Sequence, residues 1–168
     1  MKNVFLILII ILCTATGCCF SARLKQKCKF LKEIMYMLEE IRLLIEFESA
    51  EVGEIVQRLF NNKRLTELDF IRTITENLNE ETDFGSLWEK SIEIQQYAFL
   101  SADEKEFIKD IGRKLGKSDL NGQINAIKFE QNELKSMIRA ADDDYCRKAK
   151  LYRSLGVLCG AFLVIMFI

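Results

Sequence analysis

The residues of this chain that could do chemistry are few, and the first candidate is a segment rich in glycine and lysine. It reads Gly112-Arg113-Lys114-Leu115-Gly116-Lys117-Ser118. A phosphate-binding loop of the P-loop type needs four residues between its glycines and a strand before it. Here only three residues separate Gly112 from Gly116, and a helical pattern precedes them. The segment predicts a tight corner between two helices, and we expect no nucleotide and no other cofactor.

The same corner is also a candidate for binding a partner. Its basic side chains, together with the open backbone amides where a helix begins at Ser118-Asp119, could hold an acidic protein surface. The candidate residues of this partner surface are Arg113, Lys114, Gly116, Lys117, Ser118 and Asp119.

The acidic residues lack the arrangement that catalysis or metal binding requires. Asp142-Asp143-Asp144 lies in a helical context, so its carboxylates point in different directions and predict a solvated face. Glu39 and Glu40 are helical neighbours that do not face each other, so they form no catalytic pair. The chain contains no histidine, the usual general base near neutral pH. We therefore expect no catalytic residue, no metal site and no enzyme.

The six cysteines do not read as a disulfide framework, because most of them lie in apolar ends of the chain. Those four are Cys13, Cys18, Cys19 and Cys159. Cys28 and Cys146 remain between the ends, and we interpret them as small buried or lipid-facing residues. A thiol pair between these two would require the first and last helices to be neighbours.

Helices must position all of these residues. The chain has no proline and only eight glycines, which favours long helices over sheets. The sequences Ser86-Leu87-Trp88-Glu89 and Ser101-Ala102-Asp103-Glu104 both have capping-box spacing, and the polar stretch 79–85 predicts a loop. Trp88, the only tryptophan, is expected to be a core anchor. The predicted helices cover residues 23–47, 52–60, 66–78, 86–99, 102–115 and 119 onward.

The last predicted helix carries an apolar seam whose members recur by four and three. They are Leu120, Ile124, Ile127, Gln131, Leu134, Ile138, Ala141 and Tyr145. This spacing predicts a core stripe that packs against the first helix. A seam for a partner helix or for a second copy of the chain is the alternative, so a homo-oligomer stays open.

Charge divides the chain into three parts. Every charged side chain except that of Lys2 lies between Arg23 and Arg153. The net charge of −1 gives no positive electrostatic potential that would attract nucleic acid. The uncharged stretch 4–22 would be about 28 Å long as a helix, close to the hydrocarbon thickness of a bilayer. The final stretch is shorter and needs Leu151, Tyr152 and a snorkelling Arg153 to complete a span; partial insertion of this segment is the alternative. We expect an N-terminal transmembrane helix at 1–22, a helical bundle at 23–150 and a C-terminal transmembrane helix at 151–168.

Basic residues at the inner edge of both apolar ends predict the orientation. They are Arg23, Lys25, Lys27, Lys29 and Lys32 at the first end, and Arg147, Lys148, Lys150 and Arg153 at the second. Lysine and arginine beside a span are retained on the cytoplasmic side, so the central domain is expected to face the cytoplasm. At the second end, Tyr152 and Arg153 are candidate interface anchors, and Gly156 and Gly160 are spaced for close contact with another helix.

A cleaved export signal is the alternative for the N-terminal end. Ala15-Thr16-Gly17 precedes Cys18, as in the cleavage box of a bacterial lipoprotein, although such boxes prefer leucine where Ala15 stands. A lipoprotein or an anchored binding module would place its domain outside the cell. The five basic residues that follow Ala22 resist that export.

In the order of these features, the chain resembles the stage III sporulation protein AB family of spore-forming bacteria. The resemblance spans the chain and rests on the corner 111–120, on Lys150-Leu151-Tyr152-Arg153-Ser154-Leu155-Gly156-Val157-Leu158, and more weakly on Phe84-Gly85-Ser86-Leu87-Trp88. The proline that the family often has between its first two helices is absent at Glu51-Val52-Gly53.

The resemblance implies a fold and a function. The family is similar to the cytoplasmic six-helix domain of the inner-membrane platform protein of type II secretion and type IV pilus machines. It implies a non-enzymatic platform in the mother-cell membrane around the forespore, within the channel that links the two cells. The implied partners are the secretion-type ATPase stage III sporulation protein AA and other channel components.

Overall fold

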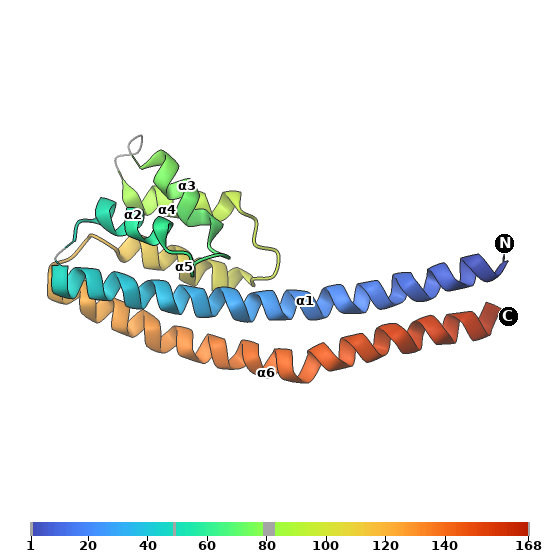
Figure 1. Ribbon diagram of the computed structural model, residues 1–168. Coiled ribbons are helices and arrows are strands. Elements are labelled where there is room, and N and C mark those ends of the chain that lie inside the picture. Colours follow the sequence, from blue (N-terminus) through green and yellow to red (C-terminus); the bar gives the residue numbers. More distant parts are fainter. Residues whose placement is uncertain (1, 49, 79–82, 168) are drawn as a thin grey trace. The chain divides into compact units, whose positions relative to one another are not determined.

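The computed structural model describes the backbone of residues 2–48, 50–78 and 83–167, and their side chains except for 2–10, 161 and 163–167. All regular structure in this part is helical (Figure 1). The prediction of an all-α chain with six helices is confirmed. The elements are α1 (Lys2–Leu43), the π-helical segment η1 (Leu44–Glu48), α2 (Val52–Asn61), α3 (Asp69–Asn77), α4 (Phe84–Ile94), α5 (Ala102–Lys114) and α6 (Leu120–Phe167).

Among the residues that can be described, no helix has an apolar stretch of the length and hydropathy needed to cross a membrane. The expected spans at 1–22 and 151–168 fall partly on residues 1–10, 161 and 163–168, whose side chains lie outside the described part. The expected loop at 79–85 likewise falls partly on residues 79–82, outside the description.

The chain forms two compact units. The helix-pair unit consists of residues 1–28 and 139–168, and the bundle unit consists of residues 29–138. Helices α1 and α6 contribute to both units, whereas η1 and α2 to α5 lie wholly in the bundle unit.

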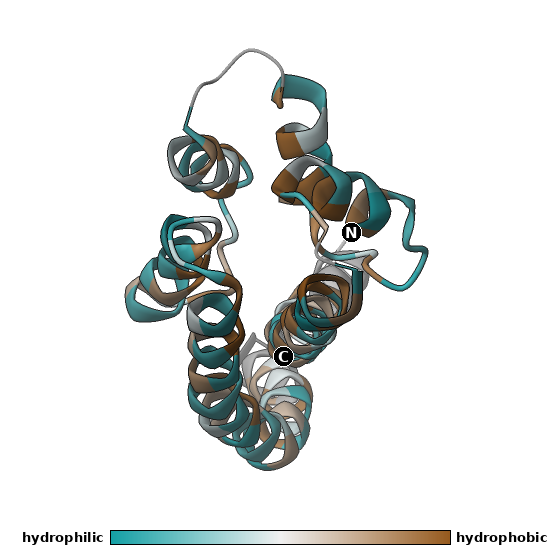
Figure 2. Ribbon diagram, turned by 90° about the vertical axis from the view of Figure 1, so that its left-hand side faces the viewer, coloured by the Kyte–Doolittle hydropathy of each residue, from teal (hydrophilic) through white to brown (hydrophobic). Residues whose placement is uncertain are grey.

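The core of the bundle unit follows from helical spacing of apolar residues. In Figure 2 its helices carry a hydrophobic side and a hydrophilic side. Burial of a large apolar side chain contributes about 1.5–3 kcal/mol, so these faces hold the unit together. The face that α1 buries is formed by Phe30, Leu31, Ile34, Met37, Leu38 and Ile41.

Trp88 is the central side chain of this core, as predicted. Only 1% of its surface is exposed, and its ring meets the Phe70 ring edge-on at 5.0 Å between centroids. Its indole N–H donates a hydrogen bond to the Ile108 carbonyl oxygen at 2.8 Å, so the polar atom is satisfied despite burial. Trp88 thereby ties α4 to α3 and α5.

The capping prediction was right at one helix and wrong at the other. At α5 the Ser101 side chain accepts from the Glu104 amide, and the Glu104 carboxylate accepts from the Ser101 amide. At α4 the N-cap is Asp83, whose carboxylate accepts the Ser86 amide at 3.0 Å and the Ser86 hydroxyl at 2.6 Å. Asp83 and Ser86 are both residue types that can cap a helix. Asp83 is the cap here, because its carboxylate accepts both hydrogen bonds that Ser86 donates.

Two other predicted boundaries differ because long-range contacts override the local pattern. The third helix begins at Asp69 and not at Thr66, because the buried Glu33 carboxylate on α1 accepts the Glu67 amide at 2.7 Å and the Thr66 hydroxyl at 3.2 Å. The fourth helix ends at Ile94 and not near Phe99. Gln96 takes the left-handed conformation at φ 43°, and the chain then turns.

The turn after α4 builds an aromatic cluster. The Tyr97 ring lies 4.7 Å from the Phe30 ring and 5.6 Å from the Phe99 ring, centroid to centroid. The Tyr97 hydroxyl accepts the Phe70 amide at 3.3 Å. Burial of this phenol raises its pKa well above the usual value of 10. These contacts explain why the helix does not continue to Phe99.

The part of the predicted α6 seam that lies in the bundle unit, up to Ile138, packs there as a core stripe. Ile127 and Leu134 are buried, and Gln131 Nε2 donates a hydrogen bond to Glu39 Oε2 of α1 at 2.8 Å. The polar interruption of the seam is therefore satisfied within the chain. Leu120, the first seam residue, is the exception because 48% of its surface is exposed.

Candidate partner surface and helix contacts

The structure explains why positions 112 and 116 of the corner segment are both glycine. A Cβ at Gly112 would lie 2.1 Å from Cγ of Trp88, so only glycine lets α5 pack against the indole. Gly116 has φ +78°, a conformation that other residues rarely adopt, and it follows the end of α5. The prediction of a tight corner is confirmed, and the likeness to a phosphate-binding loop comes from packing.

Arg113 belongs to an ion-pair network within the bundle unit. Its guanidinium donates to both Glu89 carboxylate oxygens, at 2.7 and 3.2 Å, to Glu106 at 2.6 Å and to Asp110 at 2.8 Å. The hydrogen bonds that Arg113 donates to Glu89 are the main reason why the pKa of Arg113 is raised, and they lower the pKa of Glu89. Arg113 thus joins α4 to α5, and its charge is largely compensated.

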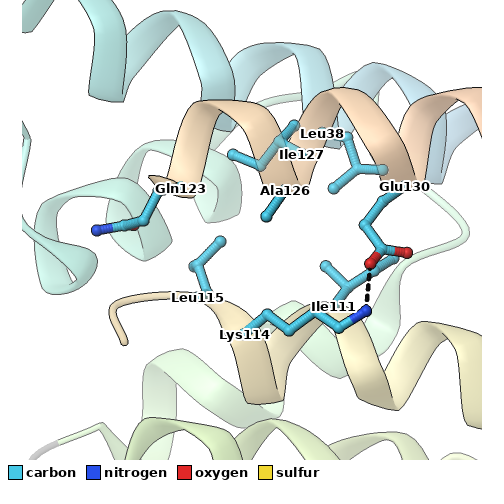
Figure 3. A pocket seen from close by; sticks show the side chains of 8 residues that line it. All are labelled: Leu38, Ile111, Lys114, Leu115, Gln123, Ala126, Ile127 and Glu130. Carbon is cyan, nitrogen blue, oxygen red and sulfur yellow. Dashed lines mark hydrogen bonds and ion pairs between the residues drawn. The ribbon is translucent and has the colours of Figure 1, made fainter. Parts of the chain in front are cut away.

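Lys114 reaches inward from the same helix. Its ammonium lies 2.5 Å from the carboxylate of Glu130 on α6, and the Glu130 side chain is only 5% exposed (Figure 3). The pair borders a cavity of about 10 Å³ whose other walls include Leu38, Ile111 and Ile127. Such a volume admits a single water at most, so the cavity is no ligand site. Lys114 serves to neutralise a buried carboxylate.

The outward part of the corner comprises Lys117, Ser118 and Asp119, all of them exposed. Gln123 of α6 braces their backbone: its amide nitrogen donates to the Ser118 carbonyl oxygen at 2.8 Å, and its Oε1 accepts the Gly116 amide at 3.3 Å. Asp119 Oδ1 accepts the Gly122 amide at 3.2 Å. The six predicted residues lie together along the chain, but Arg113 and Lys114 are engaged internally.

Sequence reasoning missed a groove beside this corner. It has a volume of about 290 Å³ and lies among η1, the start of α2 and the start of α6. Exposed apolar side chains occur on two of these elements, since Phe47 is 75% and Leu120 48% exposed. π-Helical turns such as η1 are frequent at functional sites. The lining residues are Ile45, Ala50, Glu51, Val52, Ile55, Gly116, Leu120 and Gln123.

No local pattern in the sequence indicates this groove, because apolar periodicity places one of its lining residues in the core. Leu120 fits the apolar seam and so predicted a core position. Its place at the first turn of α6, next to Gly116, leaves it at the rim of the groove instead. Phe47 lies in η1, where the change from α- to π-helical pitch alters which face each residue occupies.

In the helix-pair unit, α1 and α6 lie side by side (Figure 1), and two glycines allow this close approach. A Cβ at Gly17 would lie 2.5 Å from the Tyr152 carbonyl oxygen, and one at Gly156 would lie 2.8 Å from the Cys13 carbonyl oxygen. Gly156 therefore packs against α1 of the same chain. Gly160 is also buried. The role of Gly17 was missed because Ala15-Thr16-Gly17 also suits a cleavage box.

The predicted anchors Tyr152 and Arg153 also contact α1. The Tyr152 ring lies 5.6 Å from the Phe20 ring between centroids. Arg153 Nε donates to the Ser21 hydroxyl at 3.1 Å and to the Ala149 carbonyl oxygen at 3.3 Å. Ser21 is buried at this contact. Sequence reasoning found these two residues of α6 but not their partners on α1.

The remaining chemical candidates stay apart in the described residues. There, no cluster of three or more cysteine, aspartate or glutamate side chains could hold a metal ion. Cys28 is buried and Cys146 is exposed, and no disulfide joins any of the six cysteines, all of which lie in the described part of the chain. Asp144 pairs with Lys148 at 2.7 Å.

Comparison with known proteins agrees with the resemblance seen in the sequence. Neither the curated proteins nor the solved structures include a match. The family profile of stage III sporulation protein AB matches residues 2–168, nearly the whole chain. On this match, the chain belongs to the stage III sporulation protein AB family.

Proposed function

We propose that this protein is a membrane platform of the sporulation channel between mother cell and forespore. The single observation that carries the proposal is the family match over residues 2–168. In this role the chain is not an enzyme. It sits in the mother-cell membrane around the forespore, presents its bundle to the cytoplasm and positions the ATPase stage III sporulation protein AA.

Membrane attachment is supported by the sequence of both chain ends. Residues 4–22 and 154–168 carry no charge, and basic residues stand at their inner edges. The contact between Gly17 and Gly156 supports a paired arrangement of the two ends, because small residues allow close packing of membrane helices. In this proposal Tyr152 and Arg153 lie at the cytoplasmic interface.

The partner surface in this proposal is centred on Lys117, Ser118 and Asp119, with the groove next to them. Exposed apolar groups beside exposed polar ones are typical of protein interfaces. Arg113, Lys114 and Gly116 support this surface through the contacts described above and make little contact themselves. Mechanically, the bundle transmits position or force because α1 and α6 run without a break from the bundle unit into the helix-pair unit.

Orientation provides a test of this function. A reporter enzyme active only outside the cytoplasm, inserted at the exposed Lys63 between α2 and α3, should stay inactive in sporulating cells. A cytoplasmic reporter at the same position should be active. The opposite pair of results, together with incorporation of labelled palmitate at Cys18, would identify an exported lipoprotein and refute the proposal.

A further inference from the structure

Two basic segments that lie far apart in the sequence meet in the helix-pair unit. Neither is interrupted by acidic residues, because no aspartate or glutamate precedes Glu33 and none follows Asp144. We call these residues the basic collar. Its members are Arg23, Lys25 and Lys27 on α1 and Arg147, Lys148 and Lys150 on α6.

Contacts between α1 and α6 bring the two segments to one level. Arg153 on α6 donates to Ser21 on α1, two residues from Arg23. Farther along, the pKa of Asp144 is lowered mainly by its hydrogen bond from Lys148, with additional attraction from Lys27 and Arg147. Cations from both helices thus act on one carboxylate, in agreement with the contact between Arg153 and Ser21.

The collar contains more positive charge than the chain itself neutralises. Asp144 pairs with Lys148, but Lys25, Arg147 and Lys150 are exposed and form no ion pair with any described residue. Like charges on neighbouring helices repel one another, and an external anion reduces this repulsion. The pair of helices therefore offers several uncompensated positive charges to an anionic partner.

The neighbouring residues indicate which anion this is. The rings of Phe20 and Tyr152 lie together next to the collar, on the side of the uncharged chain ends. Aromatic side chains between apolar segments and basic residues are typical of the headgroup region of a membrane. Juxtamembrane clusters of lysine and arginine bind anionic lipids at a gain of about 1 kcal/mol per charge.

We infer that the basic collar binds anionic phospholipid headgroups at the cytoplasmic surface of the membrane. Lys25, Arg147 and Lys150 contribute the free charges, and the paired aromatic rings set the depth of the collar. This inference rests on the membrane attachment in the proposed function and adds a preference for lipid charge. Its consequence is that the lipid composition around the channel controls how firmly the bundle is held.

The test titrates the full chain in a mild non-ionic detergent with phosphatidylglycerol or phosphatidylcholine, with bound lipid measured by native mass spectrometry. The wild-type chain should bind phosphatidylglycerol preferentially. Replacing three charges by K25Q/R147Q/K150Q should raise the half-saturating lipid concentration about fivefold per charge, hence roughly a hundredfold. The matched control K63Q/K105Q/K128Q removes three lysines of the bundle unit and should bind like the wild type.

Salt and competition complete the test. Raising the ionic strength from about 0.1 M to 1 M shortens the screening length from about 10 Å to 3 Å and should weaken wild-type binding. Equal binding of both lipids, equal loss in both triple variants, or displacement of lipid by millimolar inorganic phosphate or by RNA would each overturn the inference. Alkaline carbonate extraction separates the two proposals: an embedded chain without lipid preference refutes only this one, whereas a released chain refutes the proposed function.

Discussion

At the scale of single residues, the corner segment shows how packing can imitate a binding motif. Gly112 exists to accommodate the Trp88 indole, and Gly116 exists to let the chain turn. Lys114 and Arg113 compensate carboxylates within the bundle unit. Gly112, Arg113, Lys114 and Gly116 thus have structural roles, whereas Lys117 to Asp119 are exposed and available to a partner.

Replacing Gly112 by alanine should destabilise the bundle strongly. The new methyl group would overlap the Trp88 ring, and overpacking of this kind costs about 1–3 kcal/mol. Urea unfolding of the full chain in detergent, followed by Trp88 fluorescence, measures the change. The matched control is Gly53→Ala in α2, where the Cβ would lie 3.7 Å from the Leu78 side chain. The control should be neutral or slightly stabilising, and equal loss in both variants would contradict the account of Gly112.

At the same scale, Glu39 should make stability depend on pH. Hydrogen bonds from Arg42 and then Gln131 lower the pKa of this carboxyl from 4.5 to about 2 in the folded chain. A lowered folded-state pKa stabilises the chain above the unfolded value, and this contribution is lost as the pH falls from 4.5 toward 2. Because 44% of the side chain is exposed, solvent screening limits the contribution to less than about 1 kcal/mol.

Glu39→Gln should therefore be less stable than the wild type at pH 7 and similar to it near pH 2. Unfolding free energies measured by urea titration across this range would show the difference closing as the pH falls. Glu133→Gln is the control, because this carboxylate on α6 is exposed and forms no ion pair with a described residue. A constant difference for Glu39→Gln at every pH would be inconsistent with the proposed linkage.

At the scale of elements, the sequence predicts helices well where the signal is local. The start of α5 follows from its capping box, and both this start and that of α2 at Val52 lie where the sequence predicts them. The start of α3 depends on Glu33, more than thirty residues away, and the end of α4 depends on the Tyr97 cluster. Long-range contacts of this kind have no local pattern that periodicity could detect.

The same distinction applies to the candidate sites. The residues of the corner could be named from the sequence because they are contiguous. The groove could not, because its walls come from three elements and one of them changes to π-helical pitch. Gly17 was likewise hidden, since its role depends on Gly156 at the other end of the chain.

The packing of α1 against α6 in the helix-pair unit should be sensitive to the size of the side chain at position 156. In Gly156→Leu the side chain would meet the Cys13 carbonyl oxygen, so α1 and α6 must separate locally, at a cost of about 1–3 kcal/mol. Circular dichroism on heating should show helix loss at a lower temperature, while Trp88 fluorescence, which reports on the bundle core, should change less. Val157→Leu is the control because Val157 is 51% exposed. A similar shift in both variants would argue against the close glycine contact.

At the scale of the whole molecule, the family match and the two compact units support one account. The bundle unit carries a braced corner and a groove that suit a protein partner, and the helix-pair unit carries tight packing and a basic collar that suit a membrane. The long helices α1 and α6 belong to both units. In the proposed platform, this continuity links the partner to the membrane.

The most direct test of the platform role is photocrosslinking in sporulating cells. A photoreactive amino acid at Lys117 in the corner should capture stage III sporulation protein AA, and the same amino acid at Lys63, exposed between α2 and α3, should not. Mass spectrometry of the crosslinked species identifies the partner. Capture of the ATPase from Lys117 alone is the predicted result. Its absence from Lys117 in cells that complete sporulation, or equal capture from both positions, would contradict the account.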